Sequence, residues 1–237
     1  MRTYFSSTSL FFGLGLLGIA ACGGSNVDPG AGNDPGTGTG TLVVTGSARA
    51  TSRTVNAKLD TDFDTTFSVR VSLNSQTVTT GTVTITSASG KVPLTYQLDT
   101  FWTGTAPTYD EVYILDVVSG PDKAEGIRVD GPDIHTFSAP TEGQALDSTM
   151  PNMIKWNRND MASSATLRGG NIDSLVIPDS GSYSLAAGSL KTDQTVAREN
   201  TLRLSRSNNV VPKGATGDSA WTVTIENSLD VLANPVP

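Results

Sequence analysis

Apolar and polar residues alternate with a period of two along much of the chain after residue 41. The clearest run covers residues 67–73, in which phenylalanine, two valines and leucine alternate with serine, arginine and serine. Similar runs cover residues 82–86, 92–98, 154–157, 202–205 and 221–226. Because successive side chains of a strand point to opposite faces, this pattern predicts strands with one buried and one solvated face.

Turn-forming residues separate these runs and indicate the class of fold. Glycine and proline occur between them, as in Ser89-Gly90 and Asp130-Gly131-Pro132, and such pairs mark turns. Residues 109–118 are apolar at most positions, which predicts a central strand buried on both faces. Short strands at spacings of about 8–12 residues indicate a β-sandwich or a barrel, so we expect an all-β fold.

A polar, turn-rich break at residues 140–144 divides the pattern into two parts. Each part holds roughly 100 residues, which is the size of an immunoglobulin-like sandwich. We therefore expect two immunoglobulin-like β-sandwiches, over residues 42–140 and 141–237. One larger β-sandwich is the alternative.

A short motif in the second part supports this interpretation. Residues 179–183 read Asp-Ser-Gly-Ser-Tyr and resemble the tyrosine corner of immunoglobulin domains, although Leu185 stands where those domains have a cysteine. The resemblance implies that the Tyr183 hydroxyl ties a corner of the sandwich and that Trp156 is the core tryptophan.

The N-terminus has the features of an export signal. Arg2 is the only charge before Cys22, and the apolar run at residues 10–21 is shorter than the about 20 residues that span a bilayer,. Ile19-Ala20-Ala21-Cys22 resembles the lipobox of bacterial lipoproteins. The resemblance implies that residues 1–21 are a signal peptide and that Cys22 carries a covalent lipid. Gly23 resembles the outer-membrane sorting pattern, so we expect a lipid-anchored outer-membrane protein.

A glycine-rich segment follows the cysteine. Residues 23–40 offer almost nothing to bury, so residues 22–41 are predicted to be the lipidated cysteine and a flexible tether with a reach of roughly 25 Å. Cys22 is the only cysteine, so disulfides cannot stabilise the folded part.

The charge balance excludes some partners. The chain has 16 basic and 23 acidic side chains, and removing residues 1–21 takes away Arg2 and no acid, which leaves a formal charge of −8. An acidic surface argues against nucleic acid and against electrostatic binding to anionic lipid. Contact with a membrane is therefore expected through the lipid anchor.

The sequence lacks the usual signatures of catalysis. His135 is the only histidine, no Gly-x-Ser-x-Gly motif is present, and we expect His135 to end a strand at the surface. A hydrolase would need carboxylates such as Asp110, Glu111, Asp116 and Asp133 to meet in a cleft. We therefore expect that the protein is not an enzyme.

Asp60, Asp62 and Asp64 have the spacing that opens a calcium loop,. Thr65 and Val71 occupy the positions where an EF-hand has glycine and glutamate, so the motif is not an EF-hand. The three aspartates are a weak calcium candidate, and the alternative is an acidic turn between strands. No other metal or cofactor is expected.

Aromatic residues crowd one segment of a chain that is otherwise poor in them. Phe101 and Trp102 open a predicted loop at residues 101–107, and Tyr109 follows it. Exposed tryptophan and tyrosine often anchor binding surfaces, so these three residues form a candidate patch for a glycan or protein ligand. Burial of Trp102 over the end of its own sandwich is the alternative.

These observations lead to one functional expectation with two alternatives. We expect a lipid-anchored envelope lipoprotein that acts as a non-catalytic binding or adhesion module. The first alternative is a structural accessory subunit of an envelope assembly, and the second is a hydrolase.

Overall fold

The computed structural model describes residues 32–97 and 101–236. Its regular structure is β-strand, apart from one 3-10 helix at Asp60–Asp62, so the all-β prediction is confirmed. Cys22 and the predicted signal peptide lie outside the described residues. Among the helices of the described residues, none is long and apolar enough to cross a membrane.

Three sheets make up the fold. The largest has the order β15-β14-β17-β18-β2-β3-β8-β7, with β4 beside β3 and β12 beside β18. Its strands are β2 (Leu42–Ser52), β3 (Phe63–Leu73), β4 (Gln76–Thr77), β7 (Thr95–Tyr96), β8 (Trp102–Ala106), β12 (Ala145–Leu146), β14 (Ser164–Gly169), β15 (Ile172–Ile177), β17 (Arg198–Val210) and β18 (Ala220–Ala233). A five-stranded sheet has the order β1-β10-β9-β5-β6, with β1 (Thr37–Gly38), β5 (Thr82–Ser87), β6 (Gly90–Pro93), β9 (Val112–Ser119) and β10 (Asp122–Asp130). A three-stranded sheet has the order β11-β13-β16, with β11 (Thr136–Ala139), β13 (Asn152–Asn157) and β16 (Ser182–Leu185).

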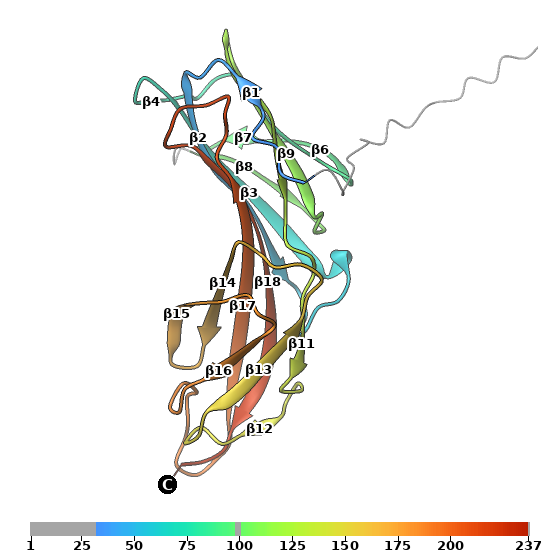
Figure 1. Cartoon of the computed structure of the whole chain (residues 1–237), viewed down its shortest axis with the longest axis vertical. Helices are drawn as coiled ribbons and strands as arrows, with labels where there is room; N and C mark the ends of the chain where they lie inside the picture. Colours follow the sequence, from blue (N-terminus) through green and yellow to red (C-terminus); the bar gives the residue numbers. More distant parts are fainter. Residues whose placement is uncertain (1–31, 98–100, 237) are drawn as a thin grey trace, which may run out of the picture.

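The molecule is elongated, and the long strands β17 and β18 run along its long axis (Figure 1). The five-stranded sheet packs on one end of the ten-stranded sheet and encloses the first core, which includes Phe67, Val69 and Tyr113. The three-stranded sheet packs on the other end and encloses the second core, which includes Trp156 and Leu202. The alternation at residues 67–73 therefore predicted the buried face of β3 correctly.

Strand β18 belongs to both cores. Its first inward side chains, Trp221, Val223 and Ile225, lie in the first core. The next ones, Leu229, Val231 and Ala233, lie in the second. The division of the chain at residue 140 stays a prediction, but the ten-stranded sheet runs through both cores because β18 does.

Strand β9 lies between β10 and β5, as expected for a central strand. Only one of its faces is fully buried. Tyr113, Leu115 and Val117 face the first core, whereas Ile114 and Asp116 on the other face are half-buried. The prediction that this strand is buried on both faces is therefore wrong, because the second face of the five-stranded sheet retains solvent contact.

Residues 33–40, which we call the N-terminal strap, are held against the first core. Residues 37–38 form β1 and pair with β10, and the backbones of Asp34 and Arg128 exchange hydrogen bonds of 3.0 and 2.8 Å. Gly40 N–H donates to the carbonyl of Gly214 at 3.0 Å. The prediction that the tether stays flexible up to residue 41 is therefore wrong for the strap.

Glycine is required where the strap meets the loop before β18. A Cβ on Gly214 would lie 2.1 Å from the backbone of Thr37, and one on Gly38 would lie 2.2 Å from the carbonyl oxygen of Lys123. The glycines that suggested a free linker therefore allow two backbones to approach closely.

Substitution of Gly214 by Ala should detach the strap. The added Cβ meets backbone atoms that cannot rotate away, so we expect the free energy of unfolding to fall by about 1–3 kcal/mol. Hydrogen exchange should show lost protection at the Thr39 and Gly40 amides. Gly217→Ala is the matched control, because a Cβ there meets nothing within 4 Å. Equal protection in both variants would contradict this account.

Candidate functional site

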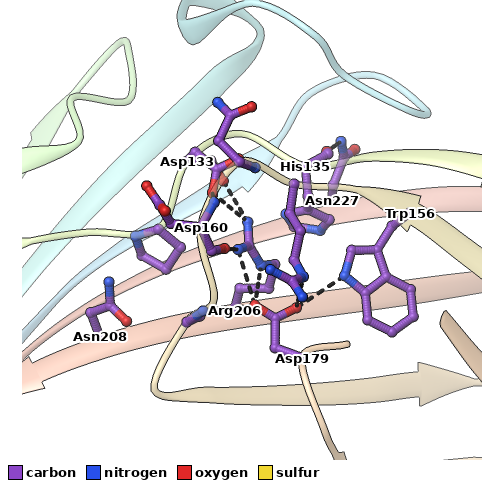
Figure 2. Close-up of polar contacts among 12 residues, drawn as sticks. Asp133, His135, Trp156, Asp160, Asp179, Arg206, Asn208 and Asn227 are labelled. Atoms are coloured by element: carbon purple, nitrogen blue, oxygen red, sulfur yellow. Dashed lines mark hydrogen bonds and ion pairs between the residues drawn. The ribbon is translucent and has the colours of Figure 1, made fainter. Parts of the chain in front are cut away.

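A cluster of buried polar side chains lies between the two cores and is centred on Arg206 of β17 (Figure 2). Leu202 and Leu204 point into the second core, and Arg206 is the next residue on the same face of the strand. Its side chain is fully buried. A buried charge is stable only when it is paired and its hydrogen bonds are made.

The guanidinium of Arg206 contacts three aspartates. Its Nε donates to a carboxylate oxygen of Asp179 at 3.0 Å. One terminal nitrogen donates to the carbonyl of Asp133 at 2.8 Å and to the carboxylate of the same residue at 3.1 Å. The other donates to the carbonyl of Asp160 and lies 3.0 Å from the carboxylate of Asp179. The positive charge is thus shared between two buried carboxylates.

Asp179 connects the turn before β16 to two other segments. It accepts hydrogen bonds from the Trp156 indole at 3.0 Å and from the backbone of Ala162 at 2.7 Å. Burial raises the pKa of Asp179, but these donors and Arg206 outweigh it, and the pKa lies below its usual value. The carboxylate therefore stays charged at neutral pH.

Asp133 precedes β11 and, like Asp179, contacts the connection between β13 and β14. Its carboxylate accepts a hydrogen bond of 2.6 Å from the backbone of Asn159. Together with the contacts to Asp160 and Ala162, this fixes the connection between β13 and β14 at three backbone groups. The cluster thus joins the end of the first core to the second.

His135 is fully buried beside this cluster, so the prediction that it lies at the surface is wrong. Its Nε2 lies 3.0 Å from the carbonyl of Leu204, so this nitrogen carries the hydrogen,. Burial and the nearby Arg206 lower the pKa of His135 to about 3. The imidazole is therefore neutral at physiological pH, and its Nε2 hydrogen is already used.

Asn227 of β18 lies next to His135, where the strand passes from one core to the other. Its amide nitrogen donates to the carbonyls of Ala57 and His135 at 2.8 and 2.7 Å. Its amide oxygen accepts a hydrogen bond of 3.0 Å from the backbone of Ala57. The side chain thus satisfies backbone groups that the sheets leave unpaired at the junction.

An acidic pocket of about 300 Å³ borders the cluster and shares Asp133 and Asp160 with it. Its lining includes Glu111, Asp130, Asp133 and Asp160, together with Asn208. Burial raises the pKa of Glu111, and the three neighbouring aspartates raise it further. Burial also raises the pKa of Asp130. The pocket therefore has a negative potential, which agrees with the acidic composition of the chain.

The carboxylates proposed for a hydrolase do not form a catalytic pair. Asp110 accepts hydrogen bonds from Ser89, and Asp116 accepts one from the backbone of Gly126 at 2.7 Å. Glu111 and Asp133 do line the same pocket. However, Asp133 is occupied by Arg206 and by the backbone of residue 159. Asp133 therefore positions the connection between β13 and β14.

The aromatic patch predicted at Phe101, Trp102 and Tyr109 does not form. Trp102 lies in β8 rather than in a loop, is 5% exposed, and donates from its indole to the carbonyl of Val78 at 3.1 Å. Tyr109 is 2% exposed and donates to the carbonyl of Pro132 at 2.6 Å. Both rings are buried because their polar atoms find partners inside the fold. Phe101 is 37% exposed and lies under the guanidinium of Arg70.

The weak calcium candidates are engaged in local contacts. The Asp62 carboxylate accepts backbone hydrogen bonds from Leu59 and Lys58, which lower its pKa. Asp64 pairs with Arg53, and Asp60 accepts a hydrogen bond from the residue that follows it. Within residues 32–97 and 101–236 no group of three or more histidines, cysteines or acids is arranged to hold a metal ion. The acidic-turn alternative describes this segment.

The predicted tyrosine corner is partly reproduced. Trp156 is a buried tryptophan of the second core, as expected. Tyr183 packs against that core and remains partly exposed. Asp179, at the start of the motif, makes the buried contacts of this corner through Trp156, Ala162 and Arg206.

Comparison with known proteins found little. No protein-family model matches the chain, and no curated protein matches it. One solved structure, which concerns host cell surface retention of a 1.5-MDa bacterial ice-binding adhesin, aligns with a TM-score of 0.27 and 15% identity. That alignment covers 80% of this chain and 66% of the other. The BSP domain of a biofilm associated protein aligns with a TM-score of 0.23 and 12% identity, over 82% of this chain and 30% of the other. This chain spans less than two thirds of each structure, and similarity at these TM-scores supports no conclusion on function.

Replacement of Arg206 by Met should destabilise the protein strongly. The change leaves Asp133 buried without its counter-charge and leaves Asp179 with only Arg158, whose Nε lies 3.9 Å away. We therefore expect the free energy of unfolding at pH 7 to fall by about 3–5 kcal/mol. Urea denaturation measures this difference. Arg203→Met is the matched control on the exposed face of the same strand, and it should change stability by less than about 0.5 kcal/mol. Similar losses in both variants would show that the buried pairs are unimportant.

His135 should make stability depend on pH. Its folded pKa lies below the unfolded value of 6.5, so the unfolded state binds the extra proton. The contribution of His135 to the free energy of unfolding is fully present above pH 6.5. It decreases by about 1.4 kcal/mol per pH unit as the pH falls towards 3. His135→Gln keeps a donor for Leu204 and does not titrate. Denaturation at pH 7 and pH 5 should therefore show a smaller loss for the variant, and parallel losses would refute the assignment.

Proposed function

We propose that the protein is a lipid-anchored lipoprotein of the outer membrane whose β-rich body acts as a non-catalytic binding or adhesion module. The lipobox at residues 19–22 supports the anchor. The shape of the β-rich body supports the role of a binding or adhesion module. The observation that carries this proposal is the ten-stranded sheet, which is continuous through both cores. The tether joins the body at the first core, so it holds the second core further from the membrane.

The two ends of the described chain lie at different places on this body. The strap lies against the first core, and β18 ends at the second core (Figure 1). If Cys22 is held in a membrane, the second core is therefore the part presented outward. The buried junction cluster supports a fixed orientation of this part, because its charges are paired across both cores.

Several exposed apolar side chains lie on the second part and are individual candidates for contact with a ligand. Met150, Met153, Val176 and Val196 are 50–76% exposed and lie in or beside strands of that part. Solvated apolar groups of this kind are available for contact with a glycan ring or a protein side chain.

Substitution of Cys22 by Ser tests the anchor. Wild-type protein expressed in a Gram-negative host should be recovered from membranes with the added mass of the acyl chains. The Cys22→Ser variant should lack this added mass, because Cys22 is the residue that accepts the acyl chains. Gly23→Ala is the control that keeps the cysteine. An unmodified wild-type protein, or a Cys22→Ser variant that still carries the mass of the acyl chains, would overturn the proposal.

Crosslinking of the native lipidated protein in its envelope then distinguishes the roles. A binding module should capture a glycan or protein ligand, and Met153→Lys should weaken that capture while Leu59→Lys, on the first part, should not. Stoichiometric capture of other envelope proteins by both variants alike would instead indicate an accessory subunit.

A further inference from the structure

The first long strand and the last strand of the chain are neighbours and run parallel. Strand β2 pairs with β18 from Thr45 opposite Ala220 to Thr51 opposite Glu226. In a parallel pair the amino ends of both strands lie at the same end of the ladder. Load that enters β2 at its amino end and β18 at its carboxyl end therefore pulls the two strands in opposite directions along their common axis.

This geometry determines how the ladder resists tension. The hydrogen bonds of a parallel pair are evenly spaced along the strands. Sliding one strand past the other strains all of them together, so they share the load. When two strands are instead peeled apart from one end, their hydrogen bonds break one after another. Each bond then carries the whole load in turn. Shear along β2 and β18 is the stronger arrangement.

Side-chain contacts reinforce the ladder at both ends. Near the amino end, the backbone of Val44 donates to the hydroxyl of Ser219 at 2.9 Å. Near the other end, the guanidinium of Arg49 lies 2.6 Å from the carboxylate of Glu226. Each contact joins β2 to β18 or to the residue just before it. Sliding must break both contacts in addition to the backbone bonds.

The ladder also determines which parts carry load. Residues 53–219 lie between the two strands in the sequence, and they include most of both cores. Tension passes from β2 directly into β18 while the ladder holds. The strands β3 to β17 lie between β2 and β18 in the sequence, so they are not stretched while the ladder holds.

The strap should yield before the ladder. Strand β1 is antiparallel to β10, and the contact of Asp34 with Arg128 is at the end where the load arrives. Its bonds therefore open in sequence. Release of residues 33–40 adds about 3 nm of extended chain.

We propose that the β2–β18 ladder is a mechanical clamp that keeps both cores folded when the chain is pulled between its N-terminal tether and its C-terminal end. The biological meaning rests on the proposed function, since the lipid anchor would supply one point of load. The clamp is a property of the folded chain, so its test needs no lipid. Failure of the clamp and failure of the anchor are therefore separate outcomes.

Single-molecule force spectroscopy tests the clamp on the mature chain with Cys22→Ser. Pulled from both termini, it should release the strap at low force. It should then unfold in one high-force step of roughly 60 nm, which is the extended length of the clamped residues. Thr41→Cys with Gly217→Cys provides handles at the same end of the ladder, so the same bonds are peeled. The rupture force should then fall at least twofold.

A pair of matched variants tests the side-chain reinforcement. Arg49→Met removes the ion pair across the ladder, and Arg53→Met removes a pair outside it. The two arginines are similarly exposed, whereas Asp64 is far more exposed than Glu226. Only the first should lower the rupture force in the end-to-end geometry. Equal rupture forces in the two pulling geometries would overturn the proposal. So would unfolding of the second core as a first, shorter step.

Discussion

Both cores depend on strand β18. Its inward side chains change core part-way along the strand, from Trp221, Val223 and Ile225 to Leu229, Val231 and Ala233. Burial of these groups completes two apolar interiors with one continuous backbone ladder to β17. Apolar burial is the main favourable term in folding. Each core is therefore stabilised in part by β18, which also contributes side chains to the other core. The two cores are coupled through this strand.

The region between the cores is polar, which is unusual for a buried site. Arg206 and its carboxylates lose their hydration there, and such pairs rarely add net stability over apolar packing. What the pairs add is a fixed geometry. Asp133 and Asp179 hold the connection between β13 and β14 at its backbone. Asn227 does the same for residues 57 and 135. The junction therefore fixes backbone segments beside both cores through side-chain hydrogen bonds.

Local pattern predicted the strands, because period-two alternation depends only on which face is buried. It also placed Trp156 in a core. It failed where partners come from far along the chain. Trp102 and His135 are buried by contacts with Val78 and Leu204 that no local pattern shows. The pairing of β2 with β18 likewise has no local signal.

Two other features that the sequence analysis did not predict could have been inferred from the sequence. Arg206 follows Leu202 and Leu204 at the same spacing, and a charge at an inward position indicates a buried pair. The glycines of the strap were interpreted as freedom, whereas they permit the close approach of two backbones. Composition alone cannot distinguish these uses, because both require the absence of a side chain.

The separation of β2 and β18 in the sequence also governs when the protein can fold. Val44 and Ser219, which share a hydrogen bond, are 175 positions apart, and contacts of such long range slow folding. As the chain is made, β2 emerges with one edge unpaired, and an open edge invites pairing with another chain. Neither interior closes until the segment after residue 220 arrives. Both cores therefore fold only after residues 220–233 have been made, and the early strands must be kept from aggregating until then.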